Sequence, residues 1–207
     1  MDMKKNDIVR LNYEAKMKEG DQKIIEMKNS PVIVGAGYMI KGVDEALETM
    51  NVGDKKEIEI SPDKGFGKRN LQMIKVIPET EFKKHGQRPA PGMFITADNL
   101  RGRVMSVSSG RVKVDFNHPL AGKTLIYNVE VSKQEDKNED KIKAIAQFYS
   151  NTEPENISVT LNGKEAEVIL PPAVHSVYKK KIADDTIKYV GLEKVKFVEV
   201  FSKTEEK

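Results

Sequence analysis

Residues 34–42 read VGAGYMIKG, which is the end of an apolar strand, a Gly-Ala-Gly turn and a run that leads into a helix. After this run, apolar side chains recur at helical spacing, at Val43, Ala46, Leu47 and Met50. The next four residues, NVGD, are typical of a helix end. The stretch therefore predicts a short strand over residues 31–34, a glycine turn and one helix over residues 43–50.

Alternating apolar and polar residues on both sides of this stretch predict further strands. They are expected over residues 8–14, 23–27, 55–61 and 124–131. The middle of the chain differs, because short strand-like runs are separated there by turn residues such as Ser108-Ser109-Gly110. These runs cover residues 93–97, 103–107 and 111–116. They predict a small all-β unit, preceded by a short helical turn after Pro78.

The last third of the chain predicts a separate unit. Residues 132–140, SKQEDKNED, contain no apolar side chain and are expected to form a linker. A helix is then expected from Ile142 to Tyr149, and Asn162-Gly163 predicts a hairpin with a type I′ turn. A second helix starting at Pro171-Pro172 and a closing strand over residues 195–201 complete an α-β-β-α-β unit.

Composition excludes several classes of protein. The chain has 207 residues and no cysteine, which excludes disulfides, thiolate catalysis, Cys-ligated zinc and iron–sulfur clusters. No apolar run approaches the roughly 18–20 residues of a membrane span, and the first residues, MDMKK, do not resemble a secretory signal. His85, His118 and His175 are far apart and lack metal-ligand spacing. We therefore expect a cytoplasmic protein without a metal site or a membrane contact.

Positive charge is concentrated in the middle of the chain. Residues 70–123 carry 9 basic and 4 acidic side chains, a net charge of +5, whereas residues 1–69 carry 13 of each and residues 124–207 carry 13 basic and 15 acidic side chains. Such a segment favours acidic partners, which include unfolded acidic chains, nucleic acid and a ribosomal surface. The plainer interpretation is a solvated Lys/Arg-rich surface, because the excess is small beside that of nucleic-acid binders. Contact with nucleic acid or the ribosome is therefore not expected.

Several stretches resemble one family. Residues 34–42, followed by VDEAL (43–47), MNVGD (50–54) and ISPDKGFG (60–67), resemble the FKBP-type peptidyl-prolyl isomerases. FNHPLAGKTL (116–125) is similar to the return segment of the SlyD-like branch, in which a small insert-in-flap chaperone domain interrupts the isomerase domain. The resemblance covers residues 1–133, and the last unit is similar to the C-terminal domain of long-chain archaeal members.

The resemblance implies an α+β fold in which an antiparallel half-barrel sheet surrounds one helix. An isomerase domain of residues 1–69 and 122–133 is interrupted by the insert at residues 70–121. Residues 134–138 form the linker, and residues 139–207 form the α-β-β-α-β domain.

The implied chemistry needs no cofactor. Rotation about an X–Pro bond faces a barrier of about 18–20 kcal/mol and breaks no covalent bond. The planar bond separates charge and the twisted transition state loses that separation, so a dry apolar pocket favours the twisted state. A backbone donor can hold the substrate chain while the bond turns. The partners expected from this chemistry are unfolded or proline-containing polypeptides.

Site residues follow from the resemblance position by position. Four carry the catalytic roles: Tyr13 as the first-strand wall, Ile40 as the backbone N–H that binds the substrate carbonyl, Phe66 at the position of the family's ligand-binding tyrosine, and Tyr127 as the last-strand wall. The expected substrate-binding residues are Ile25, Glu26, Met39, Val43 and Leu125. The alternative is that the apolar members simply fill the core and that Glu26 is an exposed strand end.

Three departures from the family pattern suggest weak activity or an altered ligand preference. Phe66 lacks the hydroxyl of the family tyrosine and so loses a hydrogen bond worth on the order of 1 kcal/mol. Val43 is smaller than the usual aromatic residue, and Glu26 is longer than the usual aspartate. The competing hypothesis is a non-enzymatic holdase chaperone with a vestigial pocket.

The insert supplies the ground for the holdase hypothesis. Methionine is adaptable and suits promiscuous binding, and apolar residues are frequent in this segment. The residues concerned are Met73, Met93, Phe94, Ile95 and Met105. Their alternative role is the small core of the insert, which some of them must form.

A homodimer through residues 139–207 is also expected. The closing strand places Val195 and Phe197, with Val198 and Val200, among charged residues, so apolar side chains are expected on both faces of the sheet. Two helices can cover one face, and an uncovered apolar face favours self-association. The resemblance to long-chain archaeal members implies the same assembly. The alternative is a monomer in which this unit packs on the isomerase domain.

Overall fold

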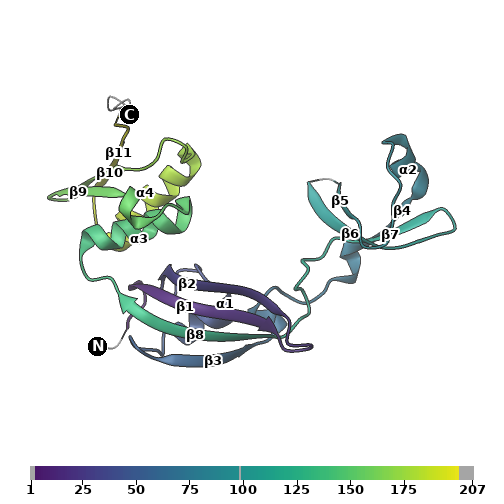
Figure 1. Cartoon of the computed structure of the whole chain (residues 1–207), viewed down its shortest axis with the longest axis horizontal. Coiled ribbons are helices and arrows are strands. Elements are labelled where there is room, and N and C mark those ends of the chain that lie inside the picture. Colours follow the sequence, from purple (N-terminus) through teal and green to yellow (C-terminus); the bar gives the residue numbers. More distant parts are fainter. Residues whose placement is uncertain (1–2, 98, 201–207) are drawn as a thin grey trace, which may run out of the picture. The chain divides into compact units, whose positions relative to one another are not determined.

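The computed structural model describes residues 3–97 and 99–200. Its contacts divide the chain into two compact units. The first unit joins Met1–Ile60 to Leu125–Lys207, and the second is Ser61–Thr124 (Figure 1). The family-type sheet and the C-terminal domain therefore share one unit, and the segment between them in sequence forms the other.

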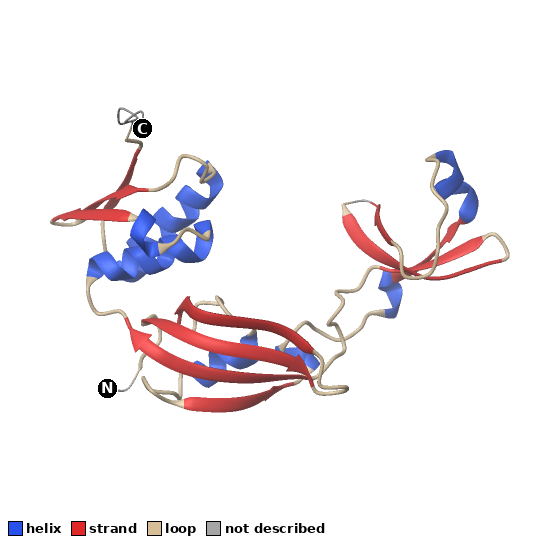
Figure 2. Cartoon of the chain, in the orientation of Figure 1, coloured by secondary structure: helices blue, strands red, loops and turns tan. Residues whose placement is uncertain are grey.

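A four-stranded antiparallel sheet forms the base of the first unit. Its strands are β1 (Ile8–Met17), β2 (Lys23–Ile33), β3 (Lys55–Ile60) and β8 (Leu125–Gln134), in the order β2-β1-β8-β3. One face, here called the inner face, carries the buried side chains of Leu11, Ala15, Leu125, Val129 and Val131. The helix α1 (Lys41–Leu47) lies against one side of the sheet, and its Val43 and Leu47 are fully buried (Figure 2). This arrangement confirms the expected α+β fold of a sheet packed on one helix.

The second strand is longer than expected. Residues 23–27 and 31–34 were predicted as separate strands, but β2 is continuous from Lys23 to Ile33. A bulge makes this possible, because the register with β1 shifts between the pairs Leu11–Ser30 and Tyr13–Met27. Asn29 lies in the bulge with φ +54°, a conformation that asparagine tolerates better than most residues.

The helix α1 is shorter than expected and ends at Leu47 instead of Met50. The N–H of Thr49 donates to the carbonyl of Ala46, and the N–H of Met50 donates to that of Leu47. Such three-residue bonds tighten the last turn of a helix. Met50 is nevertheless buried, as its place in the apolar pattern predicts.

The second unit contains a small sheet of its own. Its strands are β4 (Ile74–Pro78), β5 (Phe94–Ala97), β6 (Leu100–Ser108) and β7 (Arg111–Asp115), in the order β4-β7-β6-β5. The helix α2 (Glu79–Lys84) contributes Phe82 to a core on one face of this sheet, together with Val104, Val112, Val114 and Phe116. Short 3₁₀ turns, η1 (Pro62–Lys64) and η2 (Leu71–Met73), precede β4.

The C-terminal domain has the expected order of elements. They are α3 (Asn138–Ser150), the 3₁₀ turn η3 (Pro154–Asn156), β9 (Ser158–Asn162), β10 (Glu165–Ile169), α4 (Ser176–Val190) and β11 (Lys194–Val198). The strands form a sheet in the order β11-β10-β9, in which β11 is parallel to β10. The second helix begins at Ser176 and not at Pro171-Pro172, and the last residue of the expected closing strand, Phe201, lies outside the described residues.

The hairpin between β9 and β10 is confirmed, but its turn is shifted by one residue. Asn162 pairs with Glu165, so the turn consists of Gly163 and Lys164. Only Gly163 has a positive φ there, +61°, whereas a type I′ turn needs a positive φ at both central residues. A single positive φ at the first central residue is the pattern of a type II′ turn.

The polar segment expected to be a linker is short and is anchored at one buried residue. β8 continues to Gln134 and α3 begins at Asn138, so few of residues 134–138 are left between them. Between the two elements, Glu135 is 1% exposed and forms an ion pair with the buried Arg10. Arg10 also donates to the side chain of Gln147 on α3, at 2.8 Å. Asp136 and Lys137, which follow Glu135, are exposed, so the segment is anchored at Glu135 alone.

The C-terminal domain shares its core with the first sheet. Ile8 and Ile33 belong to the same buried cluster as Ile142, Ile145 and Ile182. The loop that precedes α1 joins this contact through Tyr38, whose hydroxyl donates to Oδ2 of Asp185 at 2.6 Å. Tyr149 donates to the same oxygen, also at 2.6 Å. The ring centroids of Phe148 and Tyr38 are 4.1 Å apart. Within residues 3–97 and 99–200, no helix is long and apolar enough to cross a membrane.

These tyrosines predict a loss of stability at alkaline pH. Burial, followed by the bond to Asp185, raises the pKa of Tyr149 to about 12 and raises the pKa of Tyr38 as well. The neutral phenols are therefore favoured in the folded state, and their contribution is complete below pH ~10 and is lost as the pH rises toward and beyond 12. Ultraviolet titration should show both phenols ionising only as the C-terminal domain separates.

Asp185→Ala removes the shared acceptor and should lower the free energy of unfolding by roughly 1–3 kcal/mol at neutral pH, measured by urea denaturation. Asp184→Ala is the matched control, because Asp184 is exposed and pairs only with Lys180 in the described residues. Equal effects of the two substitutions would contradict this account of the contact.

Candidate functional site

Tyr13 and Tyr127 lie together on the inner face of the first sheet. Tyr13 pairs with Val129 and Ala15 pairs with Tyr127 across β1 and β8, so both tyrosines point to the same side. Their rings are stacked with centroids 6.2 Å apart. Burial raises the pKa of both phenols, although a hydrogen bond with Ser30 opposes this for Tyr13. The two walls expected from the first and last strands are therefore adjacent and uncharged at neutral pH.

The remaining strand residues divide between the two faces. Leu125 is buried on the inner face, and Ile25, opposite Ala15, lies on that face with 39% of its surface exposed. Glu26 pairs with Glu14 instead and points to the other face, where it forms ion pairs with Lys23 and Lys28. The structure therefore does not bring Glu26 together with Tyr13, because neighbouring residues of a strand alternate in direction.

Ile40 occupies the N-cap position of α1. Its backbone is extended, with φ −61° and ψ 148°, and its carbonyl accepts from the N–H groups of Val43 and Asp44. In the part of the chain that the structure describes, no hydrogen bond engages the Ile40 N–H. Met39 beside it is half-buried, and Val43 is fully buried. Ile40 thus presents a donor without a protein partner, and Val43 supports it from the core.

Asp44 holds the loop that carries Ile40. One carboxylate oxygen accepts from the N–H of Gly35 and the other from the N–H of Gly37, each at 2.9 Å. Both glycines have positive φ, +69° and +79°, and a Cβ at Gly35 would lie 2.9 Å from Oε1 of Glu48. Asp44 was not among the site residues expected from the sequence. Its signal is an acidic residue in the first helical turn after a Gly-x-Gly turn, where a carboxylate can reach free N–H groups.

Phe66 belongs to the second unit, whereas the residues above belong to the first. It is half-buried, and its ring stacks on that of His118 with centroids 4.4 Å apart and planes 1° from parallel. The Nδ1 of His118 accepts from the N–H of Leu120 at 3.2 Å. His118 is a further residue that sequence reasoning missed, although it lies in the quoted return segment.

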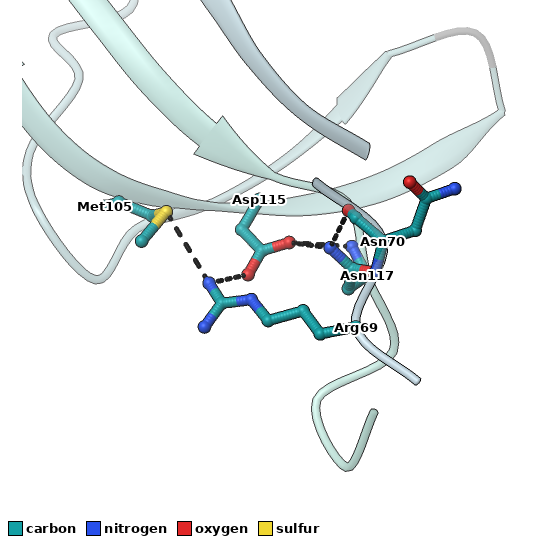
Figure 3. Close-up of polar contacts among 5 residues, drawn as sticks. All are labelled: Arg69, Asn70, Met105, Asp115 and Asn117. Atoms are coloured by element: carbon teal, nitrogen blue, oxygen red, sulfur yellow. Dashed lines mark hydrogen bonds and ion pairs between the residues drawn. The ribbon is translucent and has the colours of Figure 1, made fainter. Parts of the chain in front are cut away.

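The segment that enters the insert, shortly after Phe66, is hydrogen-bonded to the segment that leaves it, just before His118. The N–H of Asn70 donates to Oδ1 of Asn117, and Nδ2 of Asn117 donates to the carbonyl of Asn70, at 2.8 and 2.9 Å (Figure 3). Arg69 forms an ion pair with Asp115 and also contacts Sδ of Met105. Burial raises the pKa of Asp115, but hydrogen bonds from Asn117 and the charge of Arg69 outweigh burial and lower it.

The opposite face of the first sheet is polar. A shallow hollow of about 420 Å³ includes Asn12, Glu14, Asn128 and Glu130 in its lining. These side chains satisfy one another, because Asn12 donates to Glu130 and Asn128 donates to Glu14. Such a surface does not provide the apolar surroundings that an X–Pro bond needs. In residues 3–97 and 99–200, no group of three or more acidic or histidine side chains is placed to hold a metal ion.

Comparison with known proteins identifies two family models and several relatives that match this chain. A family model described as "FKBP26, IF domain" matches residues 75–120, and one described as "FKBP26_C-terminal" matches residues 138–202. The short-type peptidyl-prolyl cis-trans isomerase of Methanocaldococcus jannaschii is 34% identical over 147 residues, which cover 62% of this chain and 92% of the relative.

Bacterial relatives have similar sequence identities to this chain. The probable FKBP-type 16 kDa peptidyl-prolyl cis-trans isomerase of Pseudomonas fluorescens is 32% identical over 61% of this chain and 87% of its own length. The FKBP-type isomerase SlyD of Haemophilus influenzae is 31% identical over 63% of this chain and 72% of its own length. Together with the sheet, the helix α1 and the insert, these matches show that the chain belongs to the FKBP-type peptidyl-prolyl cis-trans isomerases, as a long member of the SlyD-like kind with isomerase activity.

Proposed function

We propose that this isomerase turns X–Pro bonds at the inner face of the first sheet and binds unfolded chains through its insert. The observation that carries the first part is the Ile40 N–H, which has no partner among the described residues and is fixed in direction by the Asp44-held loop. A donor already in place binds a substrate carbonyl without reorganisation. The stacked phenols of Tyr13 and Tyr127 supply an apolar wall.

The proposed chemistry is electrostatic. Water stabilises the charge separation of the planar X–Pro bond, so removal of water raises the planar state relative to the twisted one. The Ile40 N–H holds the substrate carbonyl while the tyrosine rings exclude water from the prolyl ring. Within the second unit, Phe66 is an apolar ring whose orientation is fixed by its stacking partner His118.

The residues of the insert that are candidates for chain binding fall into a packed group and an exposed group. Met73, Met93 and Ile95 pack against the core of the insert. Phe94 and Met105 remain exposed, at 50% and 41%. Exposed aromatic and methionine side chains suit weak, promiscuous contact with unfolded chains. Since the chain belongs to an isomerase family, chain binding is proposed as an addition to catalysis and not as a replacement for it.

The homodimer through residues 139–207 stays a prediction, but the surface expected to form the contact is no longer the sheet. Val195 and Phe197 pack toward the core of the domain, and the other face of the sheet carries mainly polar residues such as Glu165 and Lys196, which form an ion pair. In the described part of this domain, one large exposed apolar side chain, Val200, follows β11, and the others lie on the helices. The helical ones are Phe148, Val177, Tyr178 and Ile187. A dimer is therefore proposed to use this helical surface.

Substitution of Tyr127, one of the two aromatic wall residues, should lower the rate of catalysis without unfolding the protein. Tyr127→Leu keeps an apolar side chain on the inner face but removes the aromatic wall, so kcat/KM for a proline tetrapeptide should fall about tenfold, which corresponds to ~1.4 kcal/mol. Tyr127→Phe should restore most of the activity. Asn128→Ala on the polar face of the same strand is the control, and chelation by EDTA should have no effect. A Tyr127→Leu enzyme that is folded and fully active would contradict the site.

Removal of the insert should affect protein substrates most. The N–H of Gly122 donates to the carbonyl of Gly67 at 2.8 Å, so the ends of the insert are close enough for a short Gly/Ser loop to replace residues 70–121. Binding by the insert raises the local substrate concentration, to the order of mM for short connections. Catalysis of proline-limited refolding should therefore fall about 10-fold to 100-fold, while turnover of a tetrapeptide changes less than about threefold. Equal losses on both substrates would exclude this division of labour.

Light scattering tests the dimer. The full chain should have about twice the mass of the 23.3 kDa monomer, and Val177→Ser with Tyr178→Ser should shift it toward the monomer, because apolar contact area is lost. Thr160→Ala on the polar face of the C-terminal sheet is the control. A monomeric full chain at micromolar concentration would end this proposal.

A further inference from the structure

One face of the insert sheet is uncovered within its own unit. The core of the insert, including Phe82 of α2, packs on the other face. The uncovered face, here called the outer face, carries the alternate residues of the four strands. By the strand pairing and the contacts of Arg69 it includes Val76, Phe94, Arg101, Arg103, Met105, Arg111, Lys113 and Asp115.

This face displays positive charge. Arg101, Arg103, Arg111 and Lys113 are all exposed, and no ion pair engages them in the described residues of the insert. Asp115, the acidic side chain that the pairing places on this face, is already bound to Arg69. The net positive charge that the sequence shows for residues 70–123 is thus in part displayed on one sheet face.

Apolar side chains lie between these charges. Val76 is 60% exposed, Phe94 is 50% exposed and Met105 is 41% exposed. The guanidinium of Arg101 lies 4.4 Å from the centroid of the Phe94 ring, a cation–π contact that holds the charge over the aromatic residue. The face therefore offers apolar contact and fixed positive charge at the same place.

We propose that the outer face of the insert binds unfolded polypeptide segments in which acidic side chains alternate with apolar ones. The inference rests on the proposed chain-binding role of the insert and names the class of client. Carboxylates of the client pair with the four cations, and its apolar side chains contact Phe94, Met105 and Val76. Charge complementarity of this kind accelerates encounter and excludes basic chains by repulsion.

The composition of the face favours a polypeptide over a nucleic acid. Single-stranded nucleic acids bind to open aromatic rings on which bases stack. In the described residues of this face the aromatic ring is that of Phe94, and Arg101 lies over one side of it. Val76 and Met105 add aliphatic surface, which suits leucine or proline side chains better than phosphates.

Fluorescence anisotropy with the full chain tests the proposal. The probes are three labelled 20-residue unstructured peptides with the same leucine, phenylalanine and proline positions and with four Glu, four Gln or four Lys at the remaining charged positions. The Glu peptide should bind about tenfold more tightly than the Gln peptide at about 50 mM salt, and the Lys peptide should bind most weakly. The preference should shrink at about 300 mM salt, because exposed charges are then screened.

Variants separate charge from apolar contact. The triple variant Arg101→Gln, Arg103→Gln and Lys113→Gln should abolish the preference for the Glu peptide while it still binds the Gln peptide. The matched control neutralises three exposed cations elsewhere in the insert, Lys83→Gln, Lys84→Gln and Arg88→Gln, and should keep the preference. Met105→Ser should weaken the binding of all three peptides.

The outcomes distinguish this inference from the function on which it rests. Equal binding of the three peptides would overturn the acidic preference but leave chain binding intact. Absence of binding to any peptide would overturn both. Tighter binding of an oligouridine of equal charge, with displacement of the Glu peptide, would show that the face is a nucleic-acid surface and would overturn the proposal.

Discussion

The carboxylate of Asp44 sets the conformation on which the proposed site depends. The chain must pass from the end of β2 to the start of α1 within a few residues, and it does so with positive φ at Gly35 and Gly37. The N–H groups of these two glycines would lack partners in such a turn, and Asp44 accepts both. Because Asp44 lies in the first turn of α1, the same contact fixes the helix and the direction of the Ile40 N–H.

The C-terminal domain holds the other side of this loop. Tyr38 lies between Gly37 and Ile40 in sequence, and its hydroxyl is bound to Asp185 of α4. Ile8 and Ile33 of the first sheet join the core of the same domain, and the buried pair of Arg10 and Glu135 fixes the chain between β8 and α3. A buried ion pair contributes little net stability but is costly to break, so it favours one arrangement of the two parts. The domain therefore supports the loop in addition to any role in assembly.

The sequence predicts what depends on local pattern. The apolar period of Val43 and Leu47 predicts the helix, and the glycine turn before it predicts the position of the loop. It does not predict which face of a strand is covered, because that depends on elements distant in sequence. Phe94 and Ile95 must point to opposite faces, but only the packing of α2 decides that Ile95 is covered and Phe94 is exposed.

Contacts between distant residues explain the other differences. Residues 134–138 have the composition of a linker, but Arg10, more than a hundred positions earlier, binds Glu135. Glu26 was expected in the site, and the register of β2 against β1 turns it to the polar face. Asp44 and His118 were present in the quoted motifs, and their roles became clear only from the atoms that they contact.

Amide NMR of the ¹⁵N-labelled full chain, titrated with a proline tetrapeptide, tests the central claim most directly. If the substrate carbonyl accepts from Ile40, the amide proton of Ile40 should move downfield with the largest change in the first sheet and α1, since a new hydrogen bond deshields it. The amides of Asn12, Glu14 and Glu130 on the polar face should remain in place. Saturating peptide that shifts these three amides and leaves Ile40 unchanged would contradict the account.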